Sequence, residues 1–207
     1  MSQRGKFISL EGGEGVGKST QVRALSAALE ARGIDVLVTR EPGGSPGAEQ
    51  IRKLLLDPQQ DWSMTAEALL FAAARTDHVE KTIEPALAAG KWILADRFLD
   101  SSLAYQGGAG GLGIAAVRAI NASAVRDCMP DRSLVLRLTE GADRARVRDA
   151  GDSDRIGGRG DDYHSQVDRA FEAVAAEEPE RVRLIDAAGT PKEVTDRLMA
   201  AIADLLP

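Results

Sequence analysis

The segment Gly12-Gly13-Glu14-Gly15-Val16-Gly17-Lys18-Ser19 has the spacing G-x-x-x-x-G-K-S of a phosphate-binding P-loop. Its glycines let the backbone curl so that several N–H groups point at an anion. Lys18 adds a positive charge for the β- and γ-phosphates, and Ser19 offers a hydroxyl to Mg²⁺. The residues expected to bind ATP are therefore Gly12, Gly13, Glu14, Gly15, Val16, Gly17, Lys18, Ser19 and Thr20.

The residues on either side of this loop support a strand, a loop and a helix in that order. Phe7–Leu10 is a short apolar run that is typical of a buried strand. After Ser19, the apolar residues Val22, Leu25 and Leu29 recur at helical spacing. The alternative is a glycine-rich turn that binds nothing, which this context disfavours.

Size and composition bound the class of protein. The chain has 207 residues, 28% charged and 43% hydrophobic, which is typical of one globular domain with a core. A net charge of −6 argues against a broad nucleic-acid-binding face. One cysteine and two histidines make a disulfide or a structural zinc site improbable. We find neither a signal peptide nor an apolar stretch that could span a membrane, so we expect no membrane partner and a cytoplasmic location.

Five apolar runs predict an α/β fold with a central five-stranded parallel sheet flanked by helices. The runs are Phe7–Leu10, Ile34–Thr39, Trp92–Ala95, Leu134–Leu138 and Val182–Ile185, and helical patterns lie between them. Continuous rather than alternating apolar runs fit parallel strands that are buried on both faces. There is no repeat or linker, so we expect one domain over residues 1–207.

Two strands end in charged residues where ligands of open α/β sheets bind. Arg40 follows the second strand, in Thr39-Arg40-Glu41-Pro42-Gly43-Gly44, and its forked donors suit a phosphate; a surface ion pair is the alternative. Asp96 and Arg97 follow the third strand. A carboxylate there commonly organises Mg²⁺, and Arg97 could bridge two phosphates, although Asp96 could instead cap a helix.

One helical segment carries candidates for binding a planar base, and a second offers groups that suit a neutral polar ligand. Phe71 and Arg75 are four residues apart and share a helix face, so a ring and a guanidinium could hold a base, although a Phe in such a helix is usually core. Ser102, Tyr105 and Gln106 share another face and offer hydroxyl and amide groups.

Residues 144–162 alternate arginines with acids and glycines, in a segment that begins Arg144-Ala145-Arg146-Val147-Arg148. Such a run usually forms a solvated charged face. In a phosphoryl-transfer enzyme it also fits a lid, since arginines on a closing flap neutralise the transferring group and exclude water. We place this lid at about residues 145–162.

Taken together, these motifs resemble the bacterial thymidylate kinases, which belong to the P-loop nucleoside monophosphate kinases. The resemblance runs nearly end to end. It is carried by the P-loop, Thr39–Gly44 (TREPGG), Leu69–Val79 (LLFAAARTDHV), Asp96–Gly107 (DRFLDSSLAYQG) and Asp154-Arg155-Ile156. A P-loop alone serves many functions, but these segments in this order are specific.

The resemblance implies a three-layer P-loop kinase fold with an arginine-bearing lid, and transfer of the γ-phosphoryl group of ATP to thymidine 5′-monophosphate (dTMP). It implies Mg²⁺ as cofactor and a homodimer, for which Ala66–Ile83 is our candidate surface. It also implies a cis Glu41-Pro42 bond. The resemblance also implies a role for each site residue. Thymine would be bound by Phe71, Arg75, Ser102 and Gln106, the sugar would pack against Tyr105, and the acceptor phosphate would be bound by Arg40 and Arg97. Contacts to the sugar, the phosphate or hydrated Mg²⁺ would come from Glu11 and Asp96, and the metal-site residues would be Ser19 and Asp96.

The family carries its catalytic arginine either inside the P-loop or on the lid. The variable P-loop positions here hold no arginine, so the resemblance favours Arg155 as the third catalytic group beside Lys18 and Arg97. Either Arg148 or Arg159 would assist Arg155, and we also expect Arg148 to lie near ATP. The chain departs from the family pattern at Ala74 and Gly157, where acids are usual, and at Arg159, where an acid is common.

Two other functions are compatible with parts of the sequence. Another nucleotide or nucleoside kinase could share the scaffold, and its choice of acceptor would reveal it. A nucleotide-dependent switch is a rival of a different class, but the guanine-reading N-K-x-D segment is absent. Binding of dTMP without ATP would separate a switch from a kinase.

Overall fold

A computed structural model gives the fold and describes residues 4–138 and 155–207. Five strands form one sheet in the order β2-β3-β1-β4-β5, and every neighbouring pair is parallel. The strands are Phe7–Gly12 (β1), Val36–Arg40 (β2), Trp92–Asp96 (β3), Arg132–Arg137 (β4) and Val182–Asp186 (β5). The predicted α/β class and the five parallel strands are confirmed, with ends that shift by one or two residues.

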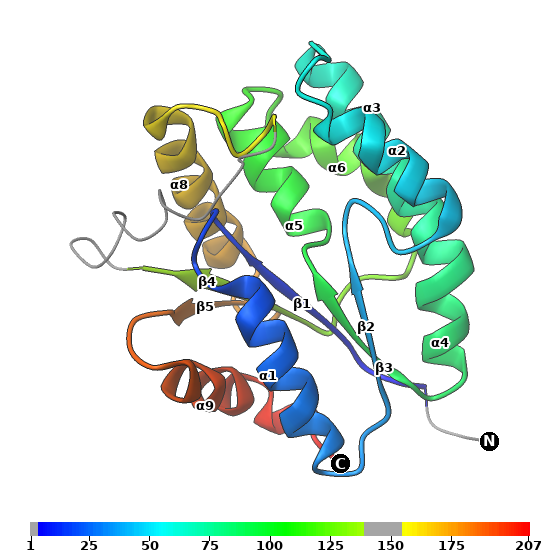
Figure 1. Cartoon of the computed structure of the whole chain (residues 1–207), viewed down its shortest axis with the longest axis vertical. Coiled ribbons are helices and arrows are strands. Elements are labelled where there is room, and N and C mark those ends of the chain that lie inside the picture. Colours follow the sequence, from blue (N-terminus) through cyan, green and yellow to red (C-terminus); the bar gives the residue numbers. More distant parts are fainter. Residues whose placement is uncertain (1–3, 139–154) are drawn as a thin grey trace.

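Helices cover both faces of this sheet (Figure 1). The helices are Lys18–Glu30 (α1), Pro46–Leu56 (α2), Met64–His78 (α3), Glu84–Ala88 (α4), Leu99–Ser102 (α5), Ile114–Val125 (α6), Asp161–Glu177 (α8) and Pro191–Ala201 (α9), with π-helical turns at Val79–Ile83 (η1) and Leu103–Ala109 (η2) and a 3₁₀ turn at Ala203–Leu205 (η3). Helices α1 and α9 pack together on one face, and α5, α6 and α8 lie over the other. None of the helices in the described ranges is long and apolar enough to cross a membrane.

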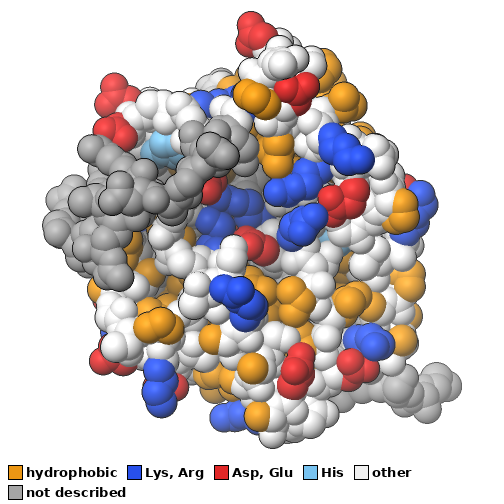
Figure 2. Space-filling view, in the orientation of Figure 1, with side chains coloured by type: hydrophobic (Ala, Val, Ile, Leu, Met, Phe, Trp, Pro, Cys, Tyr) orange, Lys and Arg blue, Asp and Glu red, His pale blue; other side chains and the backbone are white. Residues whose placement is uncertain are grey.

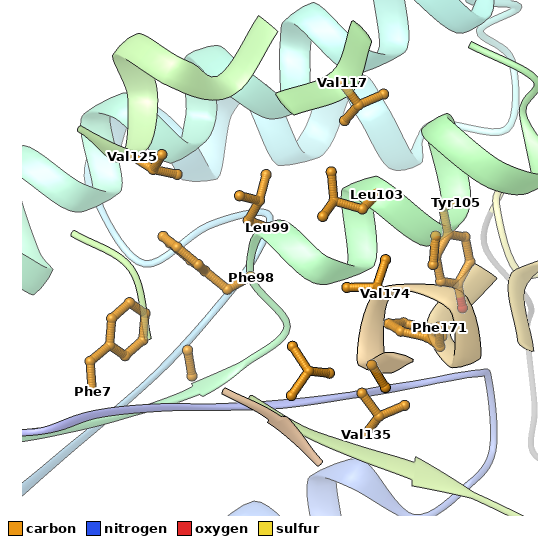
Figure 3. Packing of buried hydrophobic residues seen from close by; sticks show 14 of the residues in the cluster. Phe7, Phe98, Leu99, Leu103, Tyr105, Val117, Val125, Val135, Phe171 and Val174 are labelled. Atoms are coloured by element: carbon orange, nitrogen blue, oxygen red, sulfur yellow. The ribbon is translucent and has the colours of Figure 1, made fainter. Parts of the chain in front are cut away.

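The alternation of side chains along β1 divides the core into two halves. Ile8 and Leu10 pack on the α1/α9 face, whereas Phe7 points to the opposite face, where its ring centroid lies 4.9 Å from that of Phe98. Figure 3 shows this second half, in which side chains from the strands, α5 and η2 meet those of α8. On that same face, Glu11 follows Phe7 at the strand period and is fully buried, which brings a carboxylate to the edge of the core.

The expectation that all five strands are buried on both faces holds for the central three only. Strands β2 and β5 are the edges of the sheet and are partly exposed, so that Val38 is 45% exposed. An edge strand lacks a neighbour on one side, and short apolar runs do not reveal which strand that will be.

Local capping signals fix where several helices begin. Thr190 caps α9 in a capping box with Glu193, and Pro191 occupies the first turn. Ser45 caps α2 in the same way, by accepting a hydrogen bond from Ala48 N–H at 3.3 Å. The Ser45 cap follows shortly after the Glu41-Pro42 bond, which is cis, as the family resemblance implies.

Close packing of η2 on α8 depends on a glycine. A Cβ atom added at Gly108 would lie 2.4 Å from Ala170 Cβ, so any larger residue there would push the two elements apart. The sequence predicts an ordinary helix at this point, but the structure has a π-helical turn, a form that is often found at functional sites.

Candidate functional site

The carboxyl ends of β1, β2 and β3 open into one cavity of about 350 Å³. Figure 2 shows the hollowed face, in which lysine and arginine side chains gather. The predicted site residues that line the cavity are Glu14, Gly15, Gly17, Lys18, Ser19, Thr20, Arg40, Phe71, Arg75, Asp96, Arg97, Ser102, Tyr105 and Gln106. The structure thus brings together residues from the P-loop, three strand ends and two helices that are far apart in sequence.

The P-loop connects β1 to α1 and presents its backbone to the cavity. A Cβ atom at Gly12 would lie 2.3 Å from the Leu136 carbonyl oxygen, and φ is 128° there, so the turn requires glycine. Gly17 precedes α1, and no side chain caps this helix. The first N–H groups of α1 therefore remain available for an anion, as in known phosphate sites.

Lys18 lies inside the loop rather than on its surface. The side chain donates hydrogen bonds to the carbonyl oxygens of Gly12 at 3.2 Å and Gly13 at 2.5 Å. Burial, with a further contribution from the positive charge of Arg97, lowers the pKa of Lys18 to about 8. A bound phosphate would favour the charged form again, so this lysine suits an anionic ligand.

Ser19 and Asp96 meet at the cavity wall. The Ser19 hydroxyl donates a hydrogen bond to Asp96 Oδ2 at 3.3 Å. A hydroxyl and a carboxylate are oxygen ligands of the kind that Mg²⁺ uses together with water and phosphate oxygens. No group of three His, Cys, Asp or Glu residues in the described ranges could hold a metal ion by itself.

Arg97 occupies the junction between the P-loop and the rest of the cavity. Its φ of 71° is in the left-handed region, which costs a non-glycine residue about 1 kcal/mol or more. A backbone hydrogen bond from Arg97 N–H to the Leu10 carbonyl, 2.9 Å long, holds this conformation. The guanidinium makes four hydrogen bonds, to Gly12 O (2.9 Å), Ser101 Oγ (3.1 Å), Glu14 Oε1 (2.6 Å) and Tyr105 Oη (3.2 Å).

Glu14 belongs to the P-loop by sequence, but its carboxylate turns toward the α5/η2 side. It pairs with Arg97 and accepts a hydrogen bond from Tyr105 Oη at 3.3 Å. Burial alone would raise the pKa of Glu14, but the positive charges of Arg97 and Lys18 lower it. The side chain therefore faces residues expected to bind the acceptor, which the P-loop pattern does not reveal.

Glu11 lies behind the cavity wall and not in it. The carboxylate accepts hydrogen bonds from Phe98 N–H at 2.9 Å and from Ser101 Oγ at 2.5 Å. Burial, with the nearby charge of Asp100, raises the pKa of Glu11 to about 7. The side chain supports the segment that follows Arg97, and its expected contact with sugar, phosphate or hydrated metal stays a prediction.

Arg75 lines the cavity and is almost fully buried. Its donors are bonded to Glu41 Oε2 at 2.8 Å, to Ser102 Oγ at 3.0 Å and to Asn121 Oδ1. Glu41 also contacts His78 Nδ1 at 3.0 Å. Arg75 lines the cavity, as expected for a base-binding residue, while Glu41 and Asn121 hold its plane.

The sequence motifs assign a role to neither Glu41 nor Asn121, for different reasons. Glu41 has a usable signal, since it follows a strand end, whereas Asn121 lies in an apolar helix and has none. Arg52 was also missed: it lines the cavity from α2 and donates a hydrogen bond to the Pro42 carbonyl at 2.7 Å. Arg40 lies nearby with an exposed side chain that makes two 3.1 Å hydrogen bonds to Glu49.

Arg155 lies away from the P-loop. Its guanidinium donates hydrogen bonds to the buried carboxylate of Glu67 and, at 2.9 Å, to the carbonyl of Leu55, and it is not among the described residues that line the cavity. The family resemblance assigns Arg155 to the transferring phosphoryl group; in this structure Arg155 instead pairs with the buried carboxylate of Glu67, which also pairs with Arg159. Arg148 and residues 145–154 of the expected lid lie outside the described residues.

Three P-loop residues do not reach the cavity. Gly12 and Gly13 are buried and contribute the carbonyl oxygens that Lys18 binds, and Val16 packs against the core on the α1 face. Their expected contacts with ATP stay predictions.

Comparison with known families decides what this cavity belongs to. The family model described as "Thymidylate kinase" matches residues 10–198. The chain belongs to the thymidylate kinase family. A thymidylate kinase of Rhizorhabdus wittichii is 57% identical over 206 residues, which cover 98% of this chain and 99% of that protein. One from Gluconobacter oxydans is 46% identical over 100% of this chain and 98% of its own length.

A solved structure supports the same family. The crystal structure of thymidylate kinase from Ehrlichia chaffeensis matches with a TM-score of 0.78 and 27% identity, and the match covers 97% of this chain and 99% of that one. The family assignment made from the motifs is thus confirmed, and with it the P-loop kinase fold and the activity, phosphorylation of dTMP to dTDP.

The raised pKa of Glu11 predicts a specific dependence of stability on pH. Between its ordinary pKa of 4.5 and about 7, the folded chain keeps a proton on Glu11 that the unfolded chain has lost. The free energy of unfolding should therefore fall as pH rises through this window, by ~1–3 kcal/mol, and the variant Glu11→Gln should lack that part of the fall. Urea unfolding of both proteins at a series of pH values measures the difference. Parallel curves for the two proteins would contradict the assignment.

Proposed function

We propose that the cavity binds both substrates of this thymidylate kinase at once, with ATP on the P-loop and dTMP beside Arg75. One observation carries the proposal: a single continuous cavity is lined by Lys18 and Ser19 at one end and by Phe71 and Gln106 at the other. Arg97 lies between these ends and is bonded to residues of both.

Phosphoryl transfer requires little covalent chemistry from the protein. An oxygen of the acceptor phosphate is already a nucleophile, so alignment and charge neutralisation supply most of the rate. We assign charge neutralisation to Lys18 and Arg97, and alignment to the P-loop backbone and the base pocket. Arg155 stays a predicted third cation, and in that role it would have to exchange Glu67 for the phosphoryl group; Arg148 also stays a prediction.

Ser19 and Asp96 would hold Mg²⁺ beside the phosphates of ATP. Their contact through a hydroxyl and a carboxylate oxygen supports this assignment. When bound, the ion would neutralise negative charge that develops on the phosphate oxygens. The fold positions these two groups, because Asp96 ends β3 and Ser19 lies at the start of α1.

The base pocket has the character that thymine requires. The side chains of Phe71 and Tyr105 offer aromatic surface, and Arg75, Ser102 and Gln106 offer donors and acceptors. Tyr105 is bonded to Glu14 and Arg97, so it forms a firm wall where a ribose 2′-hydroxyl would lie. Arg40 and Arg52 extend the positive charge of this side of the cavity toward the acceptor phosphate.

The acceptor preference tests this proposal directly. A coupled ADP-release assay with ATP and Mg²⁺ should give strong turnover with dTMP, weaker turnover with dUMP and little with UMP, dCMP or GMP, because the pocket is matched to the base and the deoxyribose. Slow ADP release that is independent of the acceptor would leave the ATP site standing and refute the acceptor site. Substantial turnover of dCMP would refute the assigned base contacts.

We also propose that the chain forms a homodimer through the outer face of α3. Leu69 is 54% exposed, and the partly buried Ala66 and the exposed Ala73 lie three and four residues from it, so they form an apolar stripe on that helix. This stripe falls within the predicted surface Ala66–Ile83. The cytoplasmic location stays a prediction from the sequence.

Sedimentation equilibrium tests the dimer. The wild-type chain should sediment at twice its 22.0 kDa mass, and Leu69→Glu should shift it toward the monomer because it places a charge inside an apolar contact. The control Leu54→Ala alters an exposed leucine on α2 and should leave the dimer intact. A monomeric wild-type chain at micromolar concentration would contradict the proposal.

A further inference from the structure

Glu67 is a fully buried carboxylate that lies outside the cavity but contacts its wall. The side chain is 0% exposed and accepts hydrogen bonds from three residues: Gln106 Nε2 at 2.8 Å, Arg155, and Arg159 at 2.6 Å. The phosphate-transfer proposal involves Glu67 only as the present partner of Arg155 and gives it no role of its own. Burial of a carboxylate is costly unless it is paired, so these three partners stabilise Glu67 and are themselves held by it.

Gln106 is the only one of these three partners that lines the cavity in the described structure. Its side chain is 1% exposed, and its Oε1 atom is buried with no hydrogen-bond partner among the described residues. A carboxylate can only accept hydrogen bonds, so the amide nitrogen of Gln106 has to face Glu67. The carbonyl oxygen of the amide is thereby fixed at the other end, as an acceptor without a donor.

An unpaired buried acceptor at a base pocket selects the base that can donate to it. Thymine and uracil carry a hydrogen on N3, which donates, whereas cytosine has an unprotonated N3, which accepts. An oxygen of Gln106 directed at N3 therefore satisfies thymine and leaves cytosine with two opposed acceptors. A site built to pair a polar group rejects an analogue that cannot pair with it.

The two arginines hold Glu67 in place and link it to the turn at residues 155–160. Arg159 also donates a hydrogen bond to Tyr163 Oη at 2.6 Å and lies 4.7 Å over the Tyr163 ring. The Tyr163 hydroxyl in turn donates to the Tyr105 carbonyl at 2.8 Å. Arg155 is anchored through the Leu55 carbonyl. The network therefore connects Glu67 in α3 to α8 through Tyr163, to η2 through Tyr105 and to α2 through Leu55.

We propose that Glu67 is a positioning residue for base selection: it fixes the orientation of the Gln106 amide so that Oε1 accepts the N3–H of thymine, and Arg155 and Arg159 fix Glu67. The inference rests on the proposed function of the cavity as the dTMP site. Glu67 touches neither substrate, and its effect reaches the base through Gln106 alone.

The variant Glu67→Gln tests the inference with almost no change in shape. A glutamine can donate as well as accept, so the Gln106 amide becomes free to turn and present its nitrogen to N3. We expect the KM for dTMP to rise about tenfold with kcat within about twofold, since only binding of the base is altered, and the preference for dTMP over dCMP to narrow about tenfold. The KM for ATP should stay unchanged.

Two further variants separate positioning from simple destabilisation. Arg159→Gln should raise the KM for dTMP in the same direction by a smaller factor, and Arg159→Lys should restore part of it. Glu178→Gln is the matched control, because Glu178 also accepts from two arginines, Arg118 and Arg181, but lies outside the cavity. It should leave both the KM for dTMP and the preference over dCMP at their wild-type values.

The outcomes are distinguishable from failure of the proposed function. Wild-type protein that does not turn over dTMP would refute the dTMP site itself. With an active wild type, unchanged dTMP KM and unchanged dTMP/dCMP preference in Glu67→Gln would overturn the inference, even if its melting temperature fell. Should that variant fail to fold, an unchanged dTMP KM in folded Arg159→Gln would overturn it equally.

Discussion

The arrangement of the site depends on one residue held in an unfavourable backbone conformation. Arg97 follows β3 with a left-handed φ of 71°, which aims its guanidinium back across the end of β1. From there it bonds the P-loop at Gly12 and Glu14 and the acceptor wall at Tyr105. A relaxed, extended Arg97 would direct its side chain elsewhere, and the two ends of the cavity would lose their common cation. The strain is offset by the hydrogen bonds that this conformation makes possible.

At three places a buried carboxylate holds a part of the site in position. Glu11 lies beneath the Arg97–Ser101 segment, Glu41 orients Arg75, and Glu67 orients Gln106. Each carboxylate is fixed by hydrogen bonds, and each fixes a side chain that faces the cavity. Rigid support of this kind reduces the ordering that ligand binding requires, which matters for a reaction that proceeds mainly by alignment. It also explains why most of the acids involved do not line the cavity.

The sequence predicts the fold and the outline of the site well because both follow from local patterns. Strand, P-loop and helix are encoded within Phe7–Leu29, and strand-end residues such as Asp96 and Arg97 necessarily gather at one edge of a parallel sheet. Orientation is harder to predict, because it depends on partners that are distant in the chain. Glu14 turns toward Arg97, 83 residues away, and nothing in the P-loop pattern indicates this.

The pair Arg155 and Glu67 also shows that the partner of a charged side chain cannot be predicted from the local sequence. A run of arginines has no periodicity that assigns a partner to each one, so Arg155 was matched to the phosphates by family resemblance, whereas the structure pairs it with Glu67, 88 residues earlier. Glu67 itself lies in a helix in which glutamate is an ordinary exposed residue. Only the packing of α3 against its neighbours buries that carboxylate, and a buried carboxylate is stable only when positive charge lies beside it.

The most direct test of this account is the turnover of Arg97→Ala with ATP and dTMP. Alanine keeps the Cβ atom, so the backbone strain at this position is unchanged while the shared cation is removed. The account predicts that kcat falls by orders of magnitude, about 10³-fold, with the fold intact by circular dichroism, whereas the surface control Arg118→Ala keeps its turnover. Near-normal turnover of a folded Arg97→Ala variant would contradict the central claim that Arg97 joins the two halves of the site.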